Sequence, residues 1–379
     1  MTTPRIFLIA GEASGDALGA SLMRALRSAH GEACFSGVGG KTMIEQGLDS
    51  LFPISDIAVM GLAPVVARLP TLLARIDETA RAVVSTKPDC LVIIDAPDFT
   101  HRVARKVRRA LPDLPIVDYV SPTVWAWRPG RAKKMRAYVD CVLALLPFEP
   151  EAHARLGGPR CVYVGHPLVE HLDELAPDAH PEESPLLLVL PGSRLTEIER
   201  MTRLYGKTLA LLLRDHAKLD VAVPVAPHME APLRRALQDW PIAPRLLSQA
   251  EKFDAFRRAR AALVTSGVAT LELALANTPM AVAYKVSRFE AWLRFLIDVH
   301  SIVLPNLVIG ENAVPEFLQE EATPKALAAA LAPLLGDGSA RAAQLSAFGR
   351  VRGRLVAAGR NPSARAAEIV LEYARRGRA

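Results

Sequence analysis

Residues 6–16 of this chain read IFLIAGEASGD, and this stretch decides the fold class. An apolar run passes directly into a polar turn, and Leu18, Leu22 and Leu26 follow at the spacing of one helix face. A strand, a tight turn and a helix in this order are typical of an open α/β fold, in which ligands bind beyond the carboxyl ends of parallel strands. The first strand therefore ends at a candidate binding edge.

The turn itself carries side chains that suit a sugar. Glu12 and Ser14 offer a carboxylate and a hydroxyl to sugar hydroxyl groups, and Asp16 can cap the following helix. Gly11 and Gly15 allow a ligand to approach the backbone closely. We predict that Glu12, Ser14 and Asp16 orient a sugar. The alternative is a capped turn that binds nothing.

Length and charge narrow the class of protein. A chain of 379 residues favours two domains, and a formal net charge of +6 favours anionic partners. The basic run at 102–109 has no interleaved aromatic residues to stack bases, so we expect no nucleic-acid partner. The first strand starts too early to leave room for a signal peptide. Residues 261–284 are apolar but contain Gly267 and Pro279, which argues against a membrane-spanning helix.

Two series of alternating strand and helix patterns organise the chain, which predicts two Rossmann-like α/β domains facing a cleft. We expect a first domain over 1–166, a polar linker over 167–184 and a second domain over 185–340. The tail over 341–379 is helical and basic, and it can pack back on the first domain. Expected strands lie at 5–10, 33–37, 90–95, 115–120, 141–146, 161–164, 186–190, 220–223, 244–247, 262–265 and 280–284.

A pair of carboxylates follows the apolar run 91–94. Asp95 ends that strand, and Pro97 aims Asp98 after it. A carboxylate at the end of a buried strand is costly unless it is hydrogen-bonded or functional, and partial burial suits it to general-base chemistry. We predict that Asp95 and Asp98 are catalytic. The alternative is that Asp95 is structural and Asp98 caps a helix.

An aromatic loop, YVSPTVWAWR at 119–128, follows another strand. Trp125 and Arg128 suit stacking on a sugar and contact with an anion. The alternative is a packed aromatic loop beside a solvated basic helix.

Two turns in the second half suit a nucleotide diphosphate. Gly192, Ser193 and Arg194 lie between a strand and a helix, which is a natural phosphate site, and Glu197 and Glu199 are expected to cap that helix. The second turn repeats this logic with three donors and a carboxylate for the ribose: Ser266, Gly267, Thr270 and Glu272.

Sequence motifs for other chemistries are missing. GGKT at 39–42 resembles the end of a P-loop, but Phe35 stands where that motif requires Gly. The chain has no Asp-x-Asp metal motif, no His-x-x-x-His and no Gly-x-Ser-x-Gly. We therefore expect no metal and no cofactor.

The segment 57–73 is apolar, contains two prolines and has almost no charge. Such a stretch suits contact with an anionic membrane surface, and ordinary core packing is the alternative. The expected membrane-contact residues are Val59, Met60, Leu62, Val65, Val66, Leu69, Leu72 and Leu73.

Ten segments, in this order, resemble the lipid-A-disaccharide synthase family over nearly the whole chain. They are GEASGD (11–16), VMG (59–61), IDAPDF (94–99), YVSPTVWAWR (119–128), LPFE (146–149), VGHP (164–167), LPGSR (190–194), SGVATLE (266–272), PMAVAY (279–284) and LPNL (304–307). Thr100, Val268 and Pro64 stand where the family usually has Asn, Thr and Glu.

The resemblance implies an inverting, metal-independent glycosyltransferase of the GT-B type. It implies transfer of 2,3-diacylglucosamine from UDP to 2,3-diacylglucosamine 1-phosphate (lipid X), at the cytoplasmic face of the Gram-negative inner membrane as a peripheral protein. Asp95 would be the base with Asp98 as partner or alternate, and Asn306 would line the cleft. We also consider that the chain forms a homodimer. Two rival hypotheses are a UDP-sugar 2-epimerase of similar fold and a non-catalytic lipid-binding module.

Overall fold

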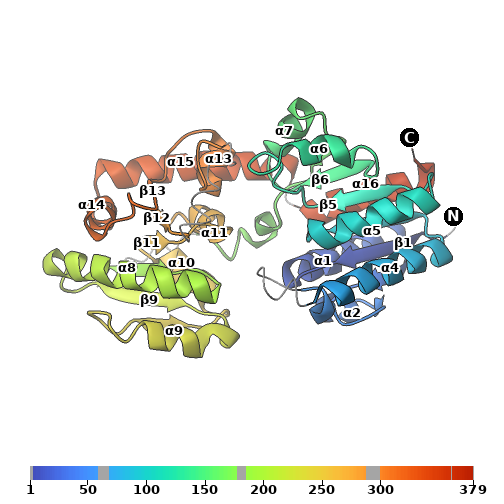
Figure 1. The fold of residues 1–379 in the computed structure, drawn as a ribbon. Coiled ribbons are helices and arrows are strands. Elements are labelled where there is room, and N and C mark those ends of the chain that lie inside the picture. The colour runs from blue at the N-terminus through green and yellow to red at the C-terminus, as the bar shows by residue number, and fades with distance from the viewer. Residues whose placement is uncertain (1–2, 59–67, 177–184, 287–298, 360, 379) are drawn as a thin grey trace. The chain divides into compact units, whose positions relative to one another are not determined.

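A computed structural model describes residues 3–58, 68–176, 185–286, 299–359 and 361–378. The chain forms two compact units (Figure 1). Unit 1 consists of Met1–Val169 together with Ala358–Ala379, and unit 2 consists of Glu170–Ala357. The chain therefore passes from unit 1 to unit 2 after Val169 and returns to unit 1 at Ala358.

Unit 1 contains a parallel sheet in the order β3-β2-β1-β4-β5-β6-β7. Its strands are β1 (Arg5–Ala10), β2 (Cys34–Val38), β3 (Asp49–Ser50), β4 (Cys90–Ile94), β5 (Ile116–Tyr119), β6 (Cys141–Ala144) and β7 (Arg160–Tyr163). Its helices are α1 (Ala13–His30), α2 (Lys41–Glu45), η1 (Ile54–Asp56), α4 (Leu69–Thr86), α5 (Pro97–Ala110), α6 (Gly130–Met135), α7 (Glu149–Arg155) and α16 (Pro362–Arg376), and η2 (Pro167–His171) runs across the boundary of the two units.

Unit 2 contains a parallel sheet in the order β10-β9-β8-β11-β12-β13. Its strands are β8 (Leu186–Leu190), β9 (Asp220–Pro224), β10 (Arg245–Leu247), β11 (Ala261–Val264), β12 (Met280–Tyr284) and β13 (Glu316–Leu318). Its helices are α8 (Leu195–Asp215), η3 (Pro227–Met229), α9 (Glu230–Ala236), α10 (Lys252–Arg258), α11 (Ala269–Leu275), α13 (Leu304–Ile309), α14 (Pro324–Leu335) and α15 (Ser339–Leu355), and η5 (Val356–Ala358) ends at the boundary. The expected α/β class with two Rossmann-like parallel sheets is confirmed.

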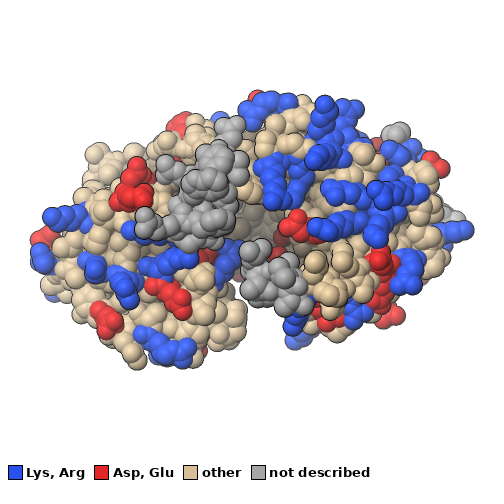
Figure 2. Space-filling view, in the orientation of Figure 1, with Lys and Arg blue, Asp and Glu red and all other residues tan. Residues whose placement is uncertain are grey.

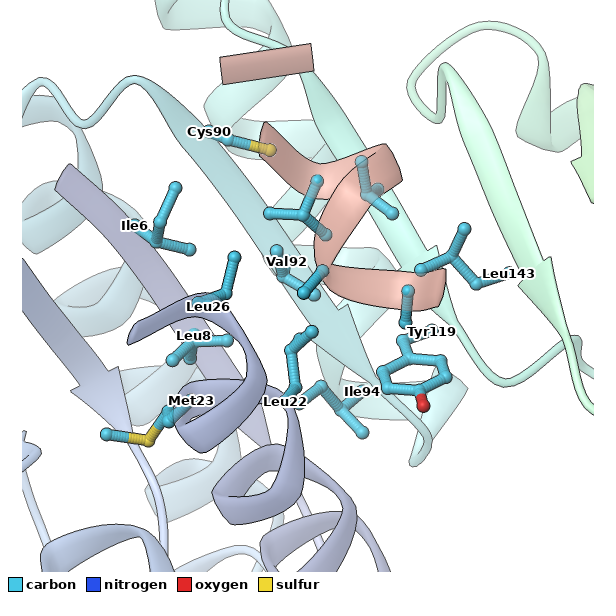
Figure 3. Close-up of a cluster of buried hydrophobic side chains, with 14 of the residues drawn as sticks. Ile6, Leu8, Leu22, Met23, Leu26, Cys90, Val92, Ile94, Tyr119 and Leu143 are labelled. Atoms are coloured by element: carbon cyan, nitrogen blue, oxygen red, sulfur yellow. The ribbon is translucent and has the colours of Figure 1, made fainter. Parts of the chain in front are cut away.

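Both faces of the unit 1 sheet are buried, which explains the unbroken apolar runs of its central strands. In β1, Ile6 and Leu8 face the core under α1 and α16, whereas Phe7 and Ile9 face the core under α4 and α5. Figure 3 shows the first of these cores, with Leu22 of α1 among the strand side chains. Because the strands are parallel, their carboxyl ends lie at the same edge of the sheet, where the polar turns follow.

Helix α16 completes unit 1 although it comes from the end of the chain. It packs against α1, and Ile369 and Val370 are buried in the same core as Leu22. Helix α15, which begins at Ser339, belongs instead to unit 2. Among the helices that the structure describes, none is both long enough and apolar enough to cross a membrane.

The packing of α16 predicts a stability effect. Replacement Ile369→Ala removes a side chain that is 3% exposed, and it should lower the free energy of unfolding of unit 1 by about 2–4 kcal/mol. Urea denaturation followed by circular dichroism measures this loss. The matched control is Glu368→Ala, which breaks only a surface ion pair with Arg365 and should cost less than about 0.5 kcal/mol. Equal losses in both variants would contradict the packing role.

Candidate functional site

The turns after β1 and β4 meet at the point where the strand order of unit 1 reverses. Ala10 and Ile94 are register partners at the carboxyl ends of these two strands. A Cβ added to Gly11 would lie 2.3 Å from the Cβ of Ala96, so the two turns are in direct contact. Ligands of open α/β sheets bind at such a reversal. The geometry therefore brings the Glu12 turn and the Asp95 turn to one edge.

Asp95 lies in a strained part of the backbone. It and Ala96 have φ angles of 53° and 44°, and two successive left-handed residues other than glycine are costly. The Asp95 Oδ1 atom accepts a hydrogen bond from the Ala96 N–H at 2.8 Å, and Thr100 Oγ1 donates to the Asp95 carbonyl at 2.8 Å. The half-buried Asp95 carboxylate is thus held in one orientation at the sheet edge.

Asp98 has a different environment from Asp95. Its side chain is 87% exposed, and its Oδ1 lies 3.2 Å from Nη2 of Arg131. An exposed carboxylate beside a guanidinium is better suited to orienting that guanidinium than to abstracting a proton. The geometry therefore favours Asp95 over Asp98 as a base.

Asp16, which we predicted to orient a sugar, is engaged by other parts of unit 1 in the described structure. Asp16 is 5% exposed, and its carboxylate accepts four hydrogen bonds, all of them from the start of α2. The donors are the N–H groups of Gly40, Thr42 and Met43 and the hydroxyl of Thr42, at 2.7–3.0 Å. Asp16 caps the next helix along the chain and has no capacity left for a ligand. Glu12, half-buried, and Ser14, exposed, stay at the edge beside Asp95.

The aromatic loop after β5 is anchored by a carboxylate that the sequence analysis did not single out. Trp125 Nε1 donates to Glu149 at 3.1 Å, and the N–H groups of Leu145 and Leu146 donate to the same carboxyl group at 3.1 and 2.9 Å. Burial raises the pKa of Glu149 to about 7, although these hydrogen bonds oppose the shift. Glu149 follows an apolar strand by a short loop, which is the same signal that identified Asp95.

Arg128 ends this loop in an exposed position. Its guanidinium carbon lies 5.3 Å from the ring centroid of Trp127, and its own φ angle is 54°. Trp125 therefore points to the buried Glu149, whereas Arg128 is presented to solvent.

The two predicted phosphate turns of unit 2 are neighbours. Leu190 and Val264 are register partners, and the Thr265 N–H donates to the Leu190 carbonyl at 2.9 Å. Here too the strand order reverses, between β8 and β11. Gly192 and Gly267 have φ angles of 109° and 132°, which L side chains rarely adopt. The turns that follow β8 and β11 thus form a second candidate ligand edge.

Glu197 occupies the start of α8, as expected for a cap. Its Oε2 accepts hydrogen bonds from the N–H groups of Ser193 and Arg194 at 3.0 and 3.3 Å, and its Oε1 accepts from Arg194 Nη1 at 3.0 Å. An anion that binds at the start of α8 must therefore share these hydrogen-bond donors with Glu197 or displace its carboxylate from them. Glu199 is not part of the cap. It lines a separate surface hollow with Arg200 and Arg203.

The hydroxyl groups of the second turn point to backbone carbonyls. Ser266 Oγ donates to the Ile302 carbonyl at 2.7 Å, and the buried Thr270 donates to the Gly267 carbonyl at 2.8 Å. Glu272 lies 2.7 Å from Lys252 Nζ and is 8% exposed. Glu272 therefore carries a partner that a ribose would have to replace.

Asn306, which we expected to line the cleft, is held inside unit 2 by hydrogen bonds, and its expected role stays a prediction. It is fully buried, its Nδ2 donates to the Val314 carbonyl at 2.9 Å and to Ser301 Oγ at 3.2 Å, and its Oδ1 accepts from the Val314 N–H at 2.9 Å. The amide holds the loop after α13 in place.

The expected membrane segment is only partly described. Val59, Met60, Leu62, Val65 and Val66 lie outside the described residues. On the first turns of α4, Leu69 and Leu73 are 45% and 46% exposed. Leu72 packs partly against the core under α4.

Metal ligation finds no support in the described ranges, where no three His, Cys, Asp or Glu side chains are placed to hold an ion.

The contact of Gly11 with Ala96 predicts a compensating pair of substitutions. Gly11→Ala places two Cβ atoms in the same space, so it should displace the Asp95 turn and lower thermal stability. The double variant Gly11→Ala, Ala96→Gly frees that space and gives a left-handed position to glycine, so stability should return. Differential scanning calorimetry measures both. Failure of Ala96→Gly to restore the melting temperature would contradict this contact.

The burial of Glu149 predicts a pH dependence. Between pH 4.5 and about 7 the folded state keeps a proton that the unfolded chain has lost, so Glu149 makes the free energy of unfolding fall as pH rises. In the wild-type protein this effect lowers the free energy of unfolding by about 3 kcal/mol across this pH range, and Glu149→Gln should abolish that fall. Urea denaturation across this pH range tests it, with the exposed Glu151→Gln on the same helix as control. A wild-type slope in Glu149→Gln would contradict the raised pKa.

Comparison with known proteins identifies the family. The lipid-A-disaccharide synthetase family matches residues 6–369. A lipid-A-disaccharide synthase from Nitrobacter hamburgensis is 54% identical, covering 98% of this chain and 97% of the relative.

Two solved structures are similar in fold alone. A UDP-GlcNAc 2-epimerase from Neisseria meningitidis has a TM-score of 0.62 at 10% identity, covering 97% of this chain and 98% of its own. The calicheamicin glycosyltransferase CalG4 has a TM-score of 0.59 at 16% identity, covering 99% of both chains. Because the family match extends over nearly every element of both units, the chain belongs to the lipid-A-disaccharide synthetase family.

Proposed function

We propose that the chain transfers 2,3-diacylglucosamine from its UDP donor to the 6-hydroxyl group of lipid X. The products are the β-1,6-linked lipid A disaccharide 1-phosphate and UDP. The class of reaction, glycosyl transfer in lipid A disaccharide synthesis, follows from family membership. The observation that carries the site is the strained Asp95 turn at the strand reversal of unit 1.

In this proposal Asp95 is the base. It takes the proton of the acceptor 6-hydroxyl while that oxygen bonds to the anomeric carbon of the donor. The bond from that carbon to the UDP oxygen breaks, and its electron pair leaves with UDP, so one displacement inverts the anomeric centre. The hydrogen bond from the Ala96 N–H keeps the Asp95 carboxylate in place before the acceptor arrives. Glu12 and Ser14 orient a sugar at the same edge.

Unit 2 holds UDP in this proposal. The Arg194 side chain is 59% exposed, so its guanidinium can turn from Glu197 to a phosphate. Arg194 and the N–H groups of Ser193 and Gly267 then stabilise the charge that develops on the leaving phosphate. Glu272, freed from Lys252, accepts the ribose hydroxyl groups. In this proposal, UDP binding thus replaces two ion pairs of the protein, Arg194 with Glu197 and Glu272 with Lys252.

The epimerase alternative is not favoured. Its structural likeness is at 10% identity and extends to the fold alone, whereas the family match covers residues 6–369. The lipid substrates add a further requirement, which is access to a membrane surface. The exposed pair Leu69 and Leu73 on α4 supports peripheral contact with the cytoplasmic face of the inner membrane. A homodimer stays a prediction.

Two substitutions test the assignment of roles, each with a matched control. Asp95→Asn preserves size and removes the base, so kcat should fall about 100-fold or more. Asp98→Asn, the matched carboxylate control, should reduce kcat far less. Arg194→Ala should lower kcat and raise the KM for the UDP donor, whereas Arg214→Ala at the opposite end of α8 should change neither.

The assay follows disaccharide and UDP formation from UDP-diacylglucosamine and lipid X. Absence of disaccharide with the wild-type chain would overturn the proposed function. Full activity of Asp95→Asn together with loss of activity in Asp98→Asn would move the base to Asp98.

A further inference from the structure

A basic hollow of about 580 Å³ lies on the surface of unit 1, between α5 and α6. Figure 2 shows Lys and Arg side chains gathered over this part of the unit. Five cationic side chains line the hollow against a single carboxylate: Arg102, Arg105, Arg128, Arg131, Lys134 and Asp98. Two arginines of the basic run at 102–109, Arg102 and Arg105, line this hollow.

Three of the lining arginines are held in defined orientations. Arg105 Nη2 donates to Tyr138 Oη at 3.1 Å, and its guanidinium lies 4.7 Å from the Tyr138 ring centroid. Arg131 is held by Asp98, and Arg128 by the Trp127 ring. Guanidinium groups that are already oriented lose little entropy when they bind an anion.

A buried polar chain stands behind Arg105. His101 lies on the wall of the hollow and is 2% exposed. Its Nδ1 is 3.1 Å from Tyr138 Oη, and its Nε2 is 3.1 Å from Oδ2 of the fully buried Asp118 in β5. Polar groups buried between a helix and a sheet are costly, so their retention needs a reason. Fixing Tyr138, and through it Arg105, supplies one.

The hollow is next to the Asp95 turn. Helix α5 starts at Pro97, two residues after Asp95, and both Pro97 and Asp98 line the hollow. Because the helix rises about 1.5 Å per residue, the lining residues begin directly beside the Asp95 turn, and Arg105 follows about 12 Å farther along the helix axis. A sugar with its reacting hydroxyl at Asp95 can therefore place a phosphate among these cations.

We infer that this hollow binds the 1-phosphate of the acceptor, with Arg105 and Arg131 as its forked ligands. The inference rests on the proposed function and names the acceptor subsite. A phosphate monoester carries close to two negative charges and three oxygen atoms that accept hydrogen bonds, which matches several forked donors better than a singly charged phosphodiester does. The hollow therefore selects the phosphorylated acceptor rather than a phospholipid headgroup.

Arg105→Gln tests the subsite in the full chain. The KM for lipid X should rise about 10- to 100-fold, the size expected for one charge-assisted hydrogen bond. The KM for the acceptor without its phosphate, 2,3-diacylglucosamine, should stay at the wild-type value for that acceptor, as should the KM for UDP-diacylglucosamine. Arg105→Lys should recover part of the loss. The control is Arg109→Gln, an exposed arginine of the same helix outside the hollow.

Tyr138→Phe tests the positioning role of the tyrosine. It removes the hydroxyl that Arg105 and His101 share, so it should raise the KM for lipid X by a smaller factor and leave kcat unchanged. A merely structural role would lower thermal stability without this selective change in KM.

Calorimetric titration with glucosamine 1-phosphate makes the test independent of turnover. Binding that is lost in Arg105→Gln and kept in Arg109→Gln supports the subsite. If the wild-type chain forms no disaccharide, only the proposed function is overturned, and the binding result for the subsite still holds. Equal binding by all three proteins, or an equal rise in KM with both acceptors, overturns the subsite. If Arg105→Gln loses binding to phosphatidylglycerol vesicles but keeps the wild-type KM for lipid X in detergent micelles, the hollow binds a membrane headgroup. That result also overturns the proposed phosphate subsite.

Discussion

The approach of the β1 turn to the β4 turn is the constraint on which the candidate catalytic edge of unit 1 depends. Gly11 has no room for a Cβ because Ala96 occupies that space, and Ala96 is there because it and Asp95 are both left-handed. The strain orients the Asp95 carboxylate, and the Thr100 hydroxyl tightens the same turn. A small residue at one strand end thus determines where a charged group lies at the next strand end.

The protein's own carboxylates occupy several of the places that would suit an anionic ligand. Asp16 accepts the N–H groups at the start of α2, Glu197 those at the start of α8, and Glu149 those of the loop before α7. The three differ in exposure. Asp16 and Glu149 are buried and serve the fold, whereas the Glu197 pair with Arg194 lies near solvent and can exchange for a phosphate. The basic hollow beside α5 is the contrasting case, with cations in excess.

The fold and the position of the polar turns at the strand reversals could be predicted because they depend on local pattern. Apolar runs with polar turns indicated the long strands and the order of the helices, and those turns do lie at the strand reversals. The short edge strands β3 and β13, of two and three residues, were missed since such lengths show no periodicity. The roles of single residues were harder to predict. The carboxylate of Asp16 and the amide of Asn306 suit hydrogen bonds to a ligand and hydrogen bonds within the protein equally well.

What the sequence by itself determined is the α/β class, the repeated strand-turn-helix pattern and the family, because these depend on the order and spacing of residues along the chain. Only the tertiary structure decided which polar side chains are already committed to other parts of the protein. It joined α16 to the core of unit 1, turned Asp16 to α2, and gathered arginines from α5 and from residues 128–131 around one hollow. The physical reason is that hydrogen bonds and ion pairs are satisfied by neighbours in space, and these lie far apart in the chain.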